Sequence, residues 1–245
     1  MNIYSKIQSS RQSGKKQFAV LVDPDKSDEP SIAALCKAAA ESKVDYFFVG
    51  GSLLSNGNLQ RCVSQIKSNC SIPVILFPGN TLQIDEHADA ILFLSLISGR
   101  NADLLIGNHV IAAPVIRNHR LEAIATGYMI VESGMPTSVQ YMSHTVPIPH
   151  DKNDIAACTA MAGELLGLKM IFMDAGSGAI NPVSEKMITS VRKNIALPII
   201  IGGGIRNAER AVASCNAGAD IIVVGNSIEK DYSLINTIAE AIHKI

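Results

Sequence analysis

Tryptophan is absent from this chain of 245 residues, and phenylalanine and tyrosine make up only 4% of it. Basic charge is not in excess either, since 21 lysines and arginines stand against 22 aspartates and glutamates. Proteins that bind nucleic acids use basic surfaces for the phosphates and aromatic rings for the bases. The composition therefore argues against a nucleic-acid partner.

Cysteine is sparse, and its five residues are scattered without any C-x-x-C motif. An odd, unclustered set argues against a zinc cluster or a disulfide framework and favours a reducing compartment. The first 17 residues are polar and lack the apolar segment of a secretory signal. The sequence contains no run of about 18 apolar residues, so it predicts no transmembrane segment. We therefore expect a cytoplasmic protein.

The chain does contain a repeated unit, in which a β-branched apolar run is followed by a polar or glycine-rich break and then a helical segment. Continuous apolar strands that alternate with helices indicate a parallel sheet buried on both faces. Eight such units in this length predict a single α/β domain over residues 1–245, closed into a (β/α)8 TIM barrel. The predicted strands are residues 18–23, 45–49, 73–77, 89–94, 123–131, 170–174, 198–201 and 220–224.

Helices are predicted between these strands, with two irregularities. The segment between residues 77 and 89 contains Pro78 and Gly79, so the third helix should be truncated or missing. Residues 132–151 are rich in Pro, Ser and Gly and predict a long loop over the barrel mouth. The predicted helices are residues 30–43, 59–69, 101–114, 153–168, 183–194, 207–217 and 232–244.

Glycines follow the last two predicted strands, at Gly202-Gly203-Gly204 and at Gly225-Asn226-Ser227. Glycine lets backbone N–H groups approach an anion, and the helix that follows adds a favourable dipole. Glycines in a single loop could serve only a tight turn. Their presence after both of these strands, where barrels bind phosphate, predicts a phosphate cradle.

Carboxylates follow strands one and six. Asp174 begins the segment Asp174-Ala175-Gly176-Ser177-Gly178 and could orient or deprotonate a substrate hydroxyl, or could cap a turn instead. Asp23 and Asp25, with Ser52 after the second strand, could hold Mg²⁺, or could form an ordinary Asp-Pro turn. Lys26 could contact a phosphate or remain a surface lysine.

Taken in order, these strand ends resemble the geranylgeranylglyceryl phosphate synthase family, which includes the heptaprenylglyceryl phosphate synthase-like prenyltransferases. The resemblance spans nearly the whole chain. Its matching stretches are residues 21–26 (LVDPDK), 48–52 (FVGGS), 76–80 (LFPGN), 144–147 (HTVP), 174–178 (DAGSG) and 201–206 (IGGGIR).

The resemblance implies Mg²⁺-dependent transfer of a long prenyl group, with geranylgeranyl expected, from its diphosphate to the hydroxyl of sn-glycerol 1-phosphate. It implies Asp23 and Ser52 as the Mg²⁺ ligands and Asp174 as the group that accepts the hydroxyl proton. It places the glycerol phosphate site at Phe172, Met173, Asp174, Ala175, Gly176, Ser177, Gly178, Gly203, Gly204, Gly225 and Asn226.

The chain departs from the family pattern at two of these positions. The family commonly has glutamate where Asp174 stands, which shortens the acidic arm by about one methylene. It often has tyrosine where Phe172 stands, so a phenol is missing from that position. The phosphate and metal residues match.

An apolar groove is expected for the prenyl tail, with Leu53, Leu54, Ile75, Phe77 and Ile97 as candidates that could equally be core residues. The alternative function is a phosphosugar isomerase or lyase on the same phosphate-binding barrel, which would use paired acid–base groups or a catalytic lysine. A third possibility is a barrel that binds glycerol phosphate without turnover. Because such barrels are often symmetric assemblies, we expect a homo-oligomer.

Overall fold

The computed structural model describes residues 2–245 and contains the predicted barrel. All eight neighbouring strand pairs are parallel, and β8 pairs with β1 to close the cylinder. The strands are β1 Gln17–Val22, β2 Tyr46–Val49, β3 Val74–Leu76, β4 Ala90–Leu96, β5 Glu122–Ile130, β6 Met170–Asp174, β7 Ile199–Gly202 and β8 Ile221–Val224. The predicted fold class is confirmed.

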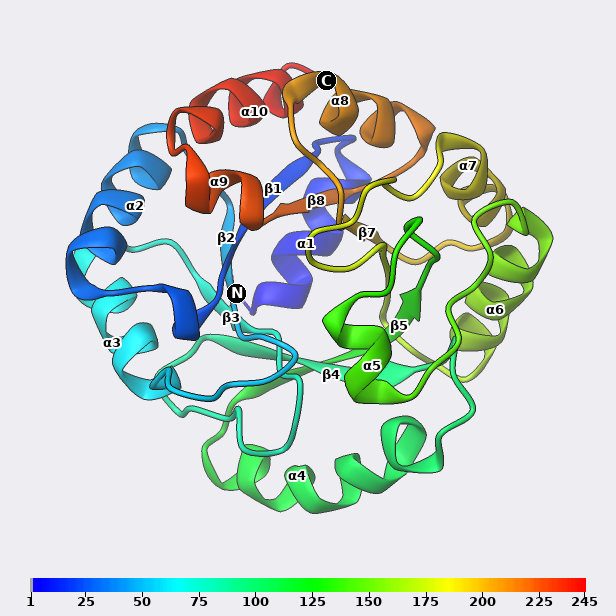
Figure 1. Cartoon of the computed structure of the whole chain (residues 1–245), viewed down its shortest axis with the longest axis horizontal. Coiled ribbons are helices and arrows are strands. Elements are labelled where there is room, and N and C mark those ends of the chain that lie inside the picture. Colours follow the sequence, from blue (N-terminus) through cyan, green and yellow to red (C-terminus); the bar gives the residue numbers. More distant parts are fainter. Residues whose placement is uncertain (1) are drawn as a thin grey trace.

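Helices form a ring around the strands (Figure 1). The α-helices are α1 Ile3–Gln12, α2 Glu29–Glu41, α3 Leu59–Asn69, α4 Asn108–Asn118, α5 Ser138–Ser143, α6 Asn153–Leu165, α7 Glu185–Asn194, α8 Ala208–Ala217, α9 Asn226–Lys230 and α10 Ser233–His243. Two short turns of other helix types are η1 Pro24–Lys26 and η2 Asp103–Gly107. None of the helices within residues 2–245 is long and apolar enough to cross a bilayer.

The core has two layers, as the alternation of side chains along each strand requires. One set of buried residues fills the barrel interior and includes Phe48, Tyr128 and Phe172. The larger set, with members such as Phe47 and Ile171, packs between the strands and the helices. The strands are therefore apolar on both faces, which is why they read as continuous hydrophobic runs in the sequence.

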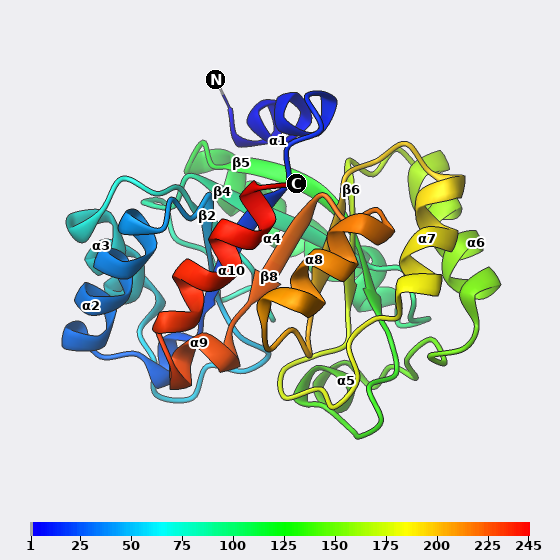
Figure 2. The ribbon, with the colours of Figure 1, turned by 90° about the horizontal axis from the view of Figure 1, so that it is seen from above.

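The two ends of the barrel are closed differently (Figure 2). Helix α1 lies across the amino-terminal end, where Ile7 is fully buried with the interior residues. Its first backbone N–H groups, at Ile3 and Tyr4, donate to the Glu122 carboxylate at the start of β5. Helix α5 lies at the opposite end, so the carboxyl-terminal end of the barrel is the one that can admit a ligand.

Between β3 and β4 the described chain contains turns and no helix, as the sequence predicts. A buried glutamine organises the segment instead. The Gln83 side chain donates to the Gly51 carbonyl at 2.8 Å and accepts from the N–H groups of Gly51 and Gly79. These bonds join the loops after β2 and β3 at the barrel mouth.

The fourth helical region differs from its prediction, which ended it at Pro114. The structure has the π-type turn η2 and then α4, which continues past Pro114 to Asn118. Proline removes the hydrogen bond to the carbonyl four residues earlier, here that of Val110. Val110 and Pro114 both lie on the exposed side of α4, where water can hydrate that carbonyl, so the helix tolerates the proline.

Candidate active site at the carboxyl-terminal end of the barrel

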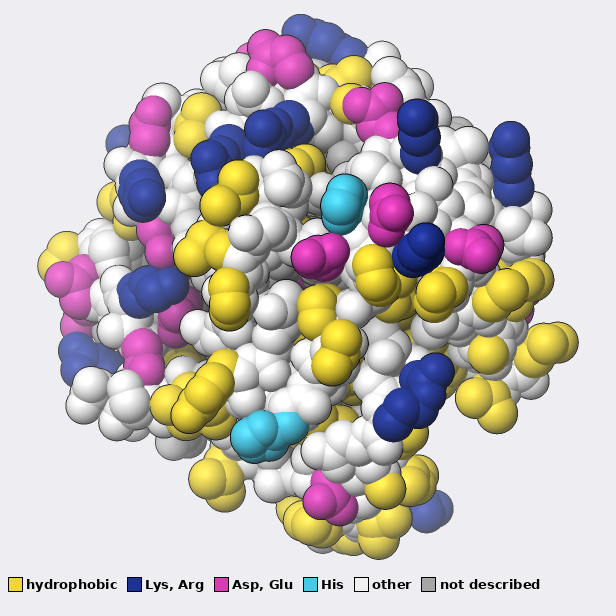
Figure 3. All heavy atoms as spheres, turned by 45° about the vertical axis from the view of Figure 1, so that its right-hand side comes forward, with side chains coloured by type: hydrophobic (Ala, Val, Ile, Leu, Met, Phe, Trp, Pro, Cys, Tyr) yellow, Lys and Arg dark blue, Asp and Glu magenta, His cyan; other side chains and the backbone are white. Residues whose placement is uncertain are grey.

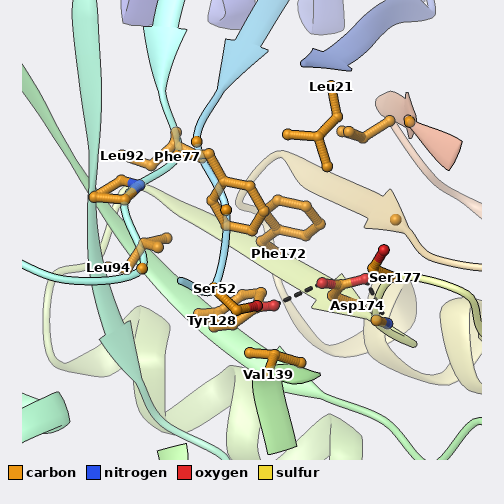
Figure 4. Close-up of a pocket in the computed structure, with 18 of the residues that line it drawn as sticks. Leu21, Ser52, Phe77, Leu92, Leu94, Tyr128, Val139, Phe172, Asp174 and Ser177 are labelled. Atoms are coloured by element: carbon orange, nitrogen blue, oxygen red, sulfur yellow. Dashed lines mark hydrogen bonds between the residues drawn. The ribbon is translucent and has the colours of Figure 1, made fainter. Parts of the chain in front are cut away.

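A cavity of about 390 Å³ opens at the carboxyl-terminal ends of the strands. One side of it is polar and is formed by the loops after β6, β7 and β8. The other side is apolar and is formed by Phe77 after β3, by β4 and by α4, and the two sides meet at Tyr128, Phe172 and Asp174 (Figure 4). The predicted mouth loop, residues 132–151, contributes Val139 and Ser143 from α5 to the lining.

The polar side brings together the glycine loops that the sequence predicts. Gly203 has a φ of +79°, and a Cβ there would meet the Gly176 and Ala175 nitrogens at 2.6 and 2.8 Å. Only glycine fits such a close approach, which leaves backbone N–H groups of two loops side by side. The Ser177 hydroxyl donates to the Asn226 side-chain oxygen at 2.9 Å and links the loops after β6 and β8.

Most residues expected at a glycerol phosphate site line this part of the cavity. They are Phe172, Asp174, Gly176, Ser177, Gly178, Gly203, Gly204, Gly225 and Asn226. Met173 and Ala175 do not line it, because their side chains point the other way along β6 and its loop and are fully buried in the layer under the helices. These two residues can reach a ligand only through their backbone.

Asp174 lies at the tip of β6, at the base of the glycine loops, and is only 7% exposed. Its Oδ1 accepts from the Gly176 N–H at 2.7 Å, and its Oδ2 accepts from the Tyr128 phenol at 2.6 Å. Burial raises the pKa of Asp174, while the two hydrogen bonds oppose that rise. A raised pKa suits a carboxylate that must take up a proton during a reaction.

Asp23 and Ser52 both line the rim of the cavity beyond the ends of β1 and β2, and β1 is the neighbour of β8. A Cβ at Gly51 would lie 3.3 Å from the Asp23 Oδ1, which places the carboxylate against the loop that carries Ser52. A carboxylate and a hydroxyl are the hard oxygen ligands that Mg²⁺ prefers, and Mg²⁺ is usually completed by water and substrate phosphates. No group of three His, Cys, Asp or Glu within residues 2–245 could hold a metal ion. The donor set therefore fits an ion shared with a phosphorylated substrate.

Asp25, which the sequence leaves as a possible second ligand, has a different position. Its carboxylate accepts from the N–H groups of Ser55, Asn56 and Gly57, so it holds the loop before α3. These hydrogen bonds lower the pKa of Asp25 to about 2, and the one from the Ser55 N–H has the largest effect. Its oxygens face the loop, whereas Asp23 lines the cavity and caps the Asp-Pro turn, where its Oδ1 accepts from the Asp25 N–H at 3.1 Å.

Lys26 is half exposed, but its ammonium is held in two ion pairs. Its ammonium lies 3.1 Å from the Asp23 Oδ2 and 3.6 Å from the Glu229 Oε2, at the rim of the cavity. A positive charge thus already stands beside the Asp23 carboxylate. A lyase or isomerase that uses a lysine would need a free amine at the reacting carbon, whereas this amine is paired with two carboxylates.

The apolar side extends from Phe77 and Phe172, whose rings stack at 5.0 Å between centroids, toward α4. Two of the predicted tail residues, Leu53 and Phe77, line the cavity, whereas Leu54, Ile75 and Ile97 pack elsewhere in the core. The sequence did not indicate the wall at β4, η2 and α4, because all of its residues except His109 are ordinary core types. That wall comprises Ile91, Leu92, Leu94, Leu96, Leu104, His109, Ala112 and Ile116.

Fold and cavity together define a (β/α)8 barrel whose mouth joins a glycine-lined polar site to an apolar groove. The chain belongs to the PcrB family, whose model matches residues 11–242. It is 55% identical over 241 residues to a geranylgeranylglyceryl phosphate synthase from Chitinophaga pinensis, covering 98% of this chain and 96% of that one. It is 41% identical to the enzyme of the same name from Pyrococcus furiosus, covering 90% and 87% of the two chains. The resemblance found in the sequence is thereby confirmed.

A solved structure agrees with this assignment. The geranylgeranylglyceryl phosphate synthase from Thermoplasma acidophilum in complex with sn-glycerol-1-phosphate superimposes with a TM-score of 0.93 at 30% identity, and the match covers 100% of both chains.

Proposed function

We propose that this chain is a prenyltransferase that forms the ether bond between a long-chain prenyl diphosphate and sn-glycerol 1-phosphate, with geranylgeranyl diphosphate as the expected donor. One observation carries the proposal. A single cavity joins a glycine-lined anion site to an apolar groove, and a buried carboxylate lies where the two meet. The names of the full-length relatives and the glycerol phosphate bound to the Thermoplasma acidophilum enzyme support it.

Different residues bind the substrates and accept the proton in the proposed reaction. The N–H groups of the loops that contain Gly203 and Gly225 bind the phosphate of glycerol phosphate and direct its hydroxyl to Asp174. The hydroxyl oxygen bonds to the allylic carbon of the donor as the bond from that carbon to the diphosphate oxygen breaks. Asp174 accepts the hydroxyl proton, and diphosphate leaves at the rim beside Asp23 and Lys26.

Mg²⁺ is the cofactor that we propose, with Asp23 and Ser52 as its ligands from the protein. When bound, it would neutralise the diphosphate and stabilise it as a leaving group. Asp23 supplies a carboxylate that faces the cavity, and the Lys26 ammonium beside it is a second positive charge for the same diphosphate. Both groups follow β1, which pairs with β8, and Lys26 reaches Glu229 in the helix after Gly225, so the two substrates would lie side by side.

The test is incubation of the chain with labelled sn-glycerol 1-phosphate and a series of prenyl diphosphates, with and without Mg²⁺. We expect labelled, organic-soluble product only when the metal and an allylic diphosphate are both present. If no donor gives product, the proposed reaction is wrong. Binding of glycerol phosphate without turnover would instead point to a barrel that only binds.

The metal assignment is tested by comparing two aspartates of the same loop. Asp23→Asn should abolish most turnover while glycerol 1-phosphate still binds, because the carboxylate ligand is lost and the glycine loops are intact. Mg²⁺ titration of the rate and calorimetry would measure the two effects. A variant with normal, magnesium-dependent rates would refute the assignment.

Asp25→Asn is the matched control, because Asp25 holds a loop. It should keep the Mg²⁺ dependence of the rate and lower the melting temperature. The depressed pKa of Asp25 also sets a pH window. Its contribution to stability is present above about pH 4 and is lost as the pH falls through about 2.

We also propose that the chain forms a homo-oligomer in the cytoplasm. Apolar side chains on the outer face of η2 and α4, at Ile106, Val110, Ile111 and Val115, are between 41% and 67% exposed. Figure 3 shows hydrophobic side chains gathered at its lower edge, where α4 lies in Figure 1. Such an apolar patch favours contact with a second copy of the chain.

Light scattering should therefore give a mass at least twice the 26.1 kDa of one chain. Ile111→Glu should shift this mass toward that of one chain, because it places a charge in the centre of the patch. A monomeric mass for the unmodified chain at micromolar concentration would contradict the proposal.

A further inference from the structure

The hydrogen bond between Tyr128 and Asp174 arises from the strand register. Tyr128 on β5 lies opposite Phe172 on β6, and Ile130 lies opposite Asp174. Tyr128 and Asp174 both point into the barrel, with the tyrosine two residues lower, a rise of about 6.6 Å along the strand. A tyrosine side chain is long enough to span this rise, so its hydroxyl meets the carboxylate (Figure 4).

Neighbouring rings fix the orientation of Tyr128. Its ring packs edge-on against Phe77 at 5.6 Å and against Phe172 at 5.4 Å between centroids. Tyr128 is only 6% exposed and lines the cavity at the boundary between its apolar and polar sides. Among the side chains within residues 2–245, the Tyr128 hydroxyl has Asp174 as its hydrogen-bond partner.

The Asp174 carboxylate is held at both oxygens, by the Tyr128 phenol at 2.6 Å and by the Gly176 N–H at 2.7 Å. An O–H···O distance of 2.6 Å is typical of a neutral donor with an ionised carboxylate. Each carboxylate oxygen can accept a second hydrogen bond, so Asp174 can still receive one from a substrate hydroxyl. The two donors therefore fix the direction of the carboxylate without occupying it fully.

The direction of the pKa shifts agrees with this geometry. Burial raises the pKa of Asp174, and the hydrogen bond from Tyr128 lowers it again. Burial and the nearby carboxylate raise the pKa of Tyr128 well above its usual value, so the phenol keeps its proton. Tyr128 is the titratable side chain that contacts the Asp174 carboxylate, and the other neighbour is the Gly176 backbone.

We infer that Tyr128 is a positioning residue, whose phenol holds the Asp174 carboxylate toward the glycine loops so that it can accept the substrate hydroxyl proton. This inference rests on the proposed function, since it gives Tyr128 a part in the same reaction. Tyr128 itself neither gives nor takes a proton in the net reaction. Its contribution is the fixed orientation and charge of its neighbour.

The test compares Tyr128→Phe with Tyr46→Phe. Tyr46 is also a buried tyrosine of the barrel interior, but its hydroxyl accepts from the Gln17 side chain and it does not line the cavity. Loss of a hydrogen bond to a charged group should lower kcat of Tyr128→Phe by about tenfold or more. KM for glycerol 1-phosphate should change little, because the glycine loops are untouched. Tyr46→Phe should leave both constants unchanged.

The pH dependence separates positioning from a general effect on packing. The reaction needs Asp174 ionised, so the rate falls as the pH falls through its pKa. Without the phenol, only the Gly176 N–H still opposes the effect of burial on the pKa of Asp174, so the acidic limb of the rate profile should move to higher pH. A mere loosening of the core would lower the rate at all pH values and leave that limb in place.

A second measurement does not depend on turnover. In protein labelled with ¹³C at the aspartate carboxyl carbon, the Asp174 resonance is identified by its loss in Asp174→Asn. Its titration midpoint should rise in Tyr128→Phe and stay constant in Tyr46→Phe. An unchanged midpoint and an unchanged acidic limb in an active enzyme would overturn the role of Tyr128 alone. Absence of product from the unmodified chain would instead overturn the proposed function.

Discussion

Replacement of Asp174 by asparagine should lower kcat by about 10²-fold or more while glycerol 1-phosphate still binds. Removal of a general base costs about 10²–10⁴-fold in rate. Asparagine keeps the shape of the site, because its oxygen can accept from the Gly176 N–H and its amide can donate to the Tyr128 hydroxyl. Steady-state rates with saturating donor and calorimetric binding of glycerol 1-phosphate measure the two effects.

The pH profile of the unmodified chain provides a check on the same residue. Because burial raises the pKa of Asp174, the acidic limb of the profile should lie above the ordinary aspartate value of about 3.9. Asp174→Asn has no carboxyl group at this position, so its residual rate should lack that limb. Asp174→Asn with near-normal turnover would show that another group takes the proton.

Replacement of Gly203 by alanine should weaken glycerol 1-phosphate binding by about 10- to 100-fold, the range expected when hydrogen bonds to a charged group are lost. The new Cβ would lie 2.6 Å from the Gly176 nitrogen and 2.8 Å from the Asp174 Oδ1. Such contacts force the two loops apart, and with them the N–H groups that would bind the phosphate. Calorimetry with glycerol 1-phosphate alone measures the loss.

Gly167→Ala separates this clash from backbone strain. Gly167 also has a positive φ, of +85°, but a Cβ there meets nothing within 4 Å. It lies between α6 and β6, outside the cavity. Each alanine should cost about 1–2 kcal/mol of stability through its left-handed conformation. Only Gly203→Ala should lose affinity, and equal affinities for the two variants would contradict the proposed phosphate site.

Much of the fold could be predicted from the sequence because it depends on local pattern. The strands of a barrel are buried on both faces, so each appears as an apolar run, and their ends lie within two residues of the predictions. The α3 prediction, residues 59–69, matches Leu59–Asn69. Parallel strands also end at one rim, which is why the residues after strands six, seven and eight could be grouped from sequence alone.

Other parts depend on contacts that sequence does not display. Helix α1 is mostly polar and buries only Ile7 fully, with Ile3 and Tyr4 partly buried beside it, so its apolar face is too short to recognise. The loop role of Asp25 depends on backbone N–H groups about thirty residues away, at Ser55 and Asn56. Tyr128 appears as one more residue of a buried strand until the register of β5 and β6 brings it to Asp174.

The mouth loop illustrates both cases. Its length and composition predict a cover for the barrel, and it does reach the cavity. Its helix α5, Ser138–Ser143, is only six residues long and was not predicted. Such a short helix has little stability of its own and depends on packing against the rest of the molecule.

The most direct test of the two-sided site is a crystal structure of this chain with sn-glycerol 1-phosphate. We predict that the phosphate lies on the backbone N–H groups of the loops that contain Gly176, Gly203 and Gly225, with a glycerol hydroxyl within hydrogen-bond distance of the Asp174 carboxylate. A phosphate bound away from these glycines, or a hydroxyl that faces away from Asp174, would contradict this account of the site.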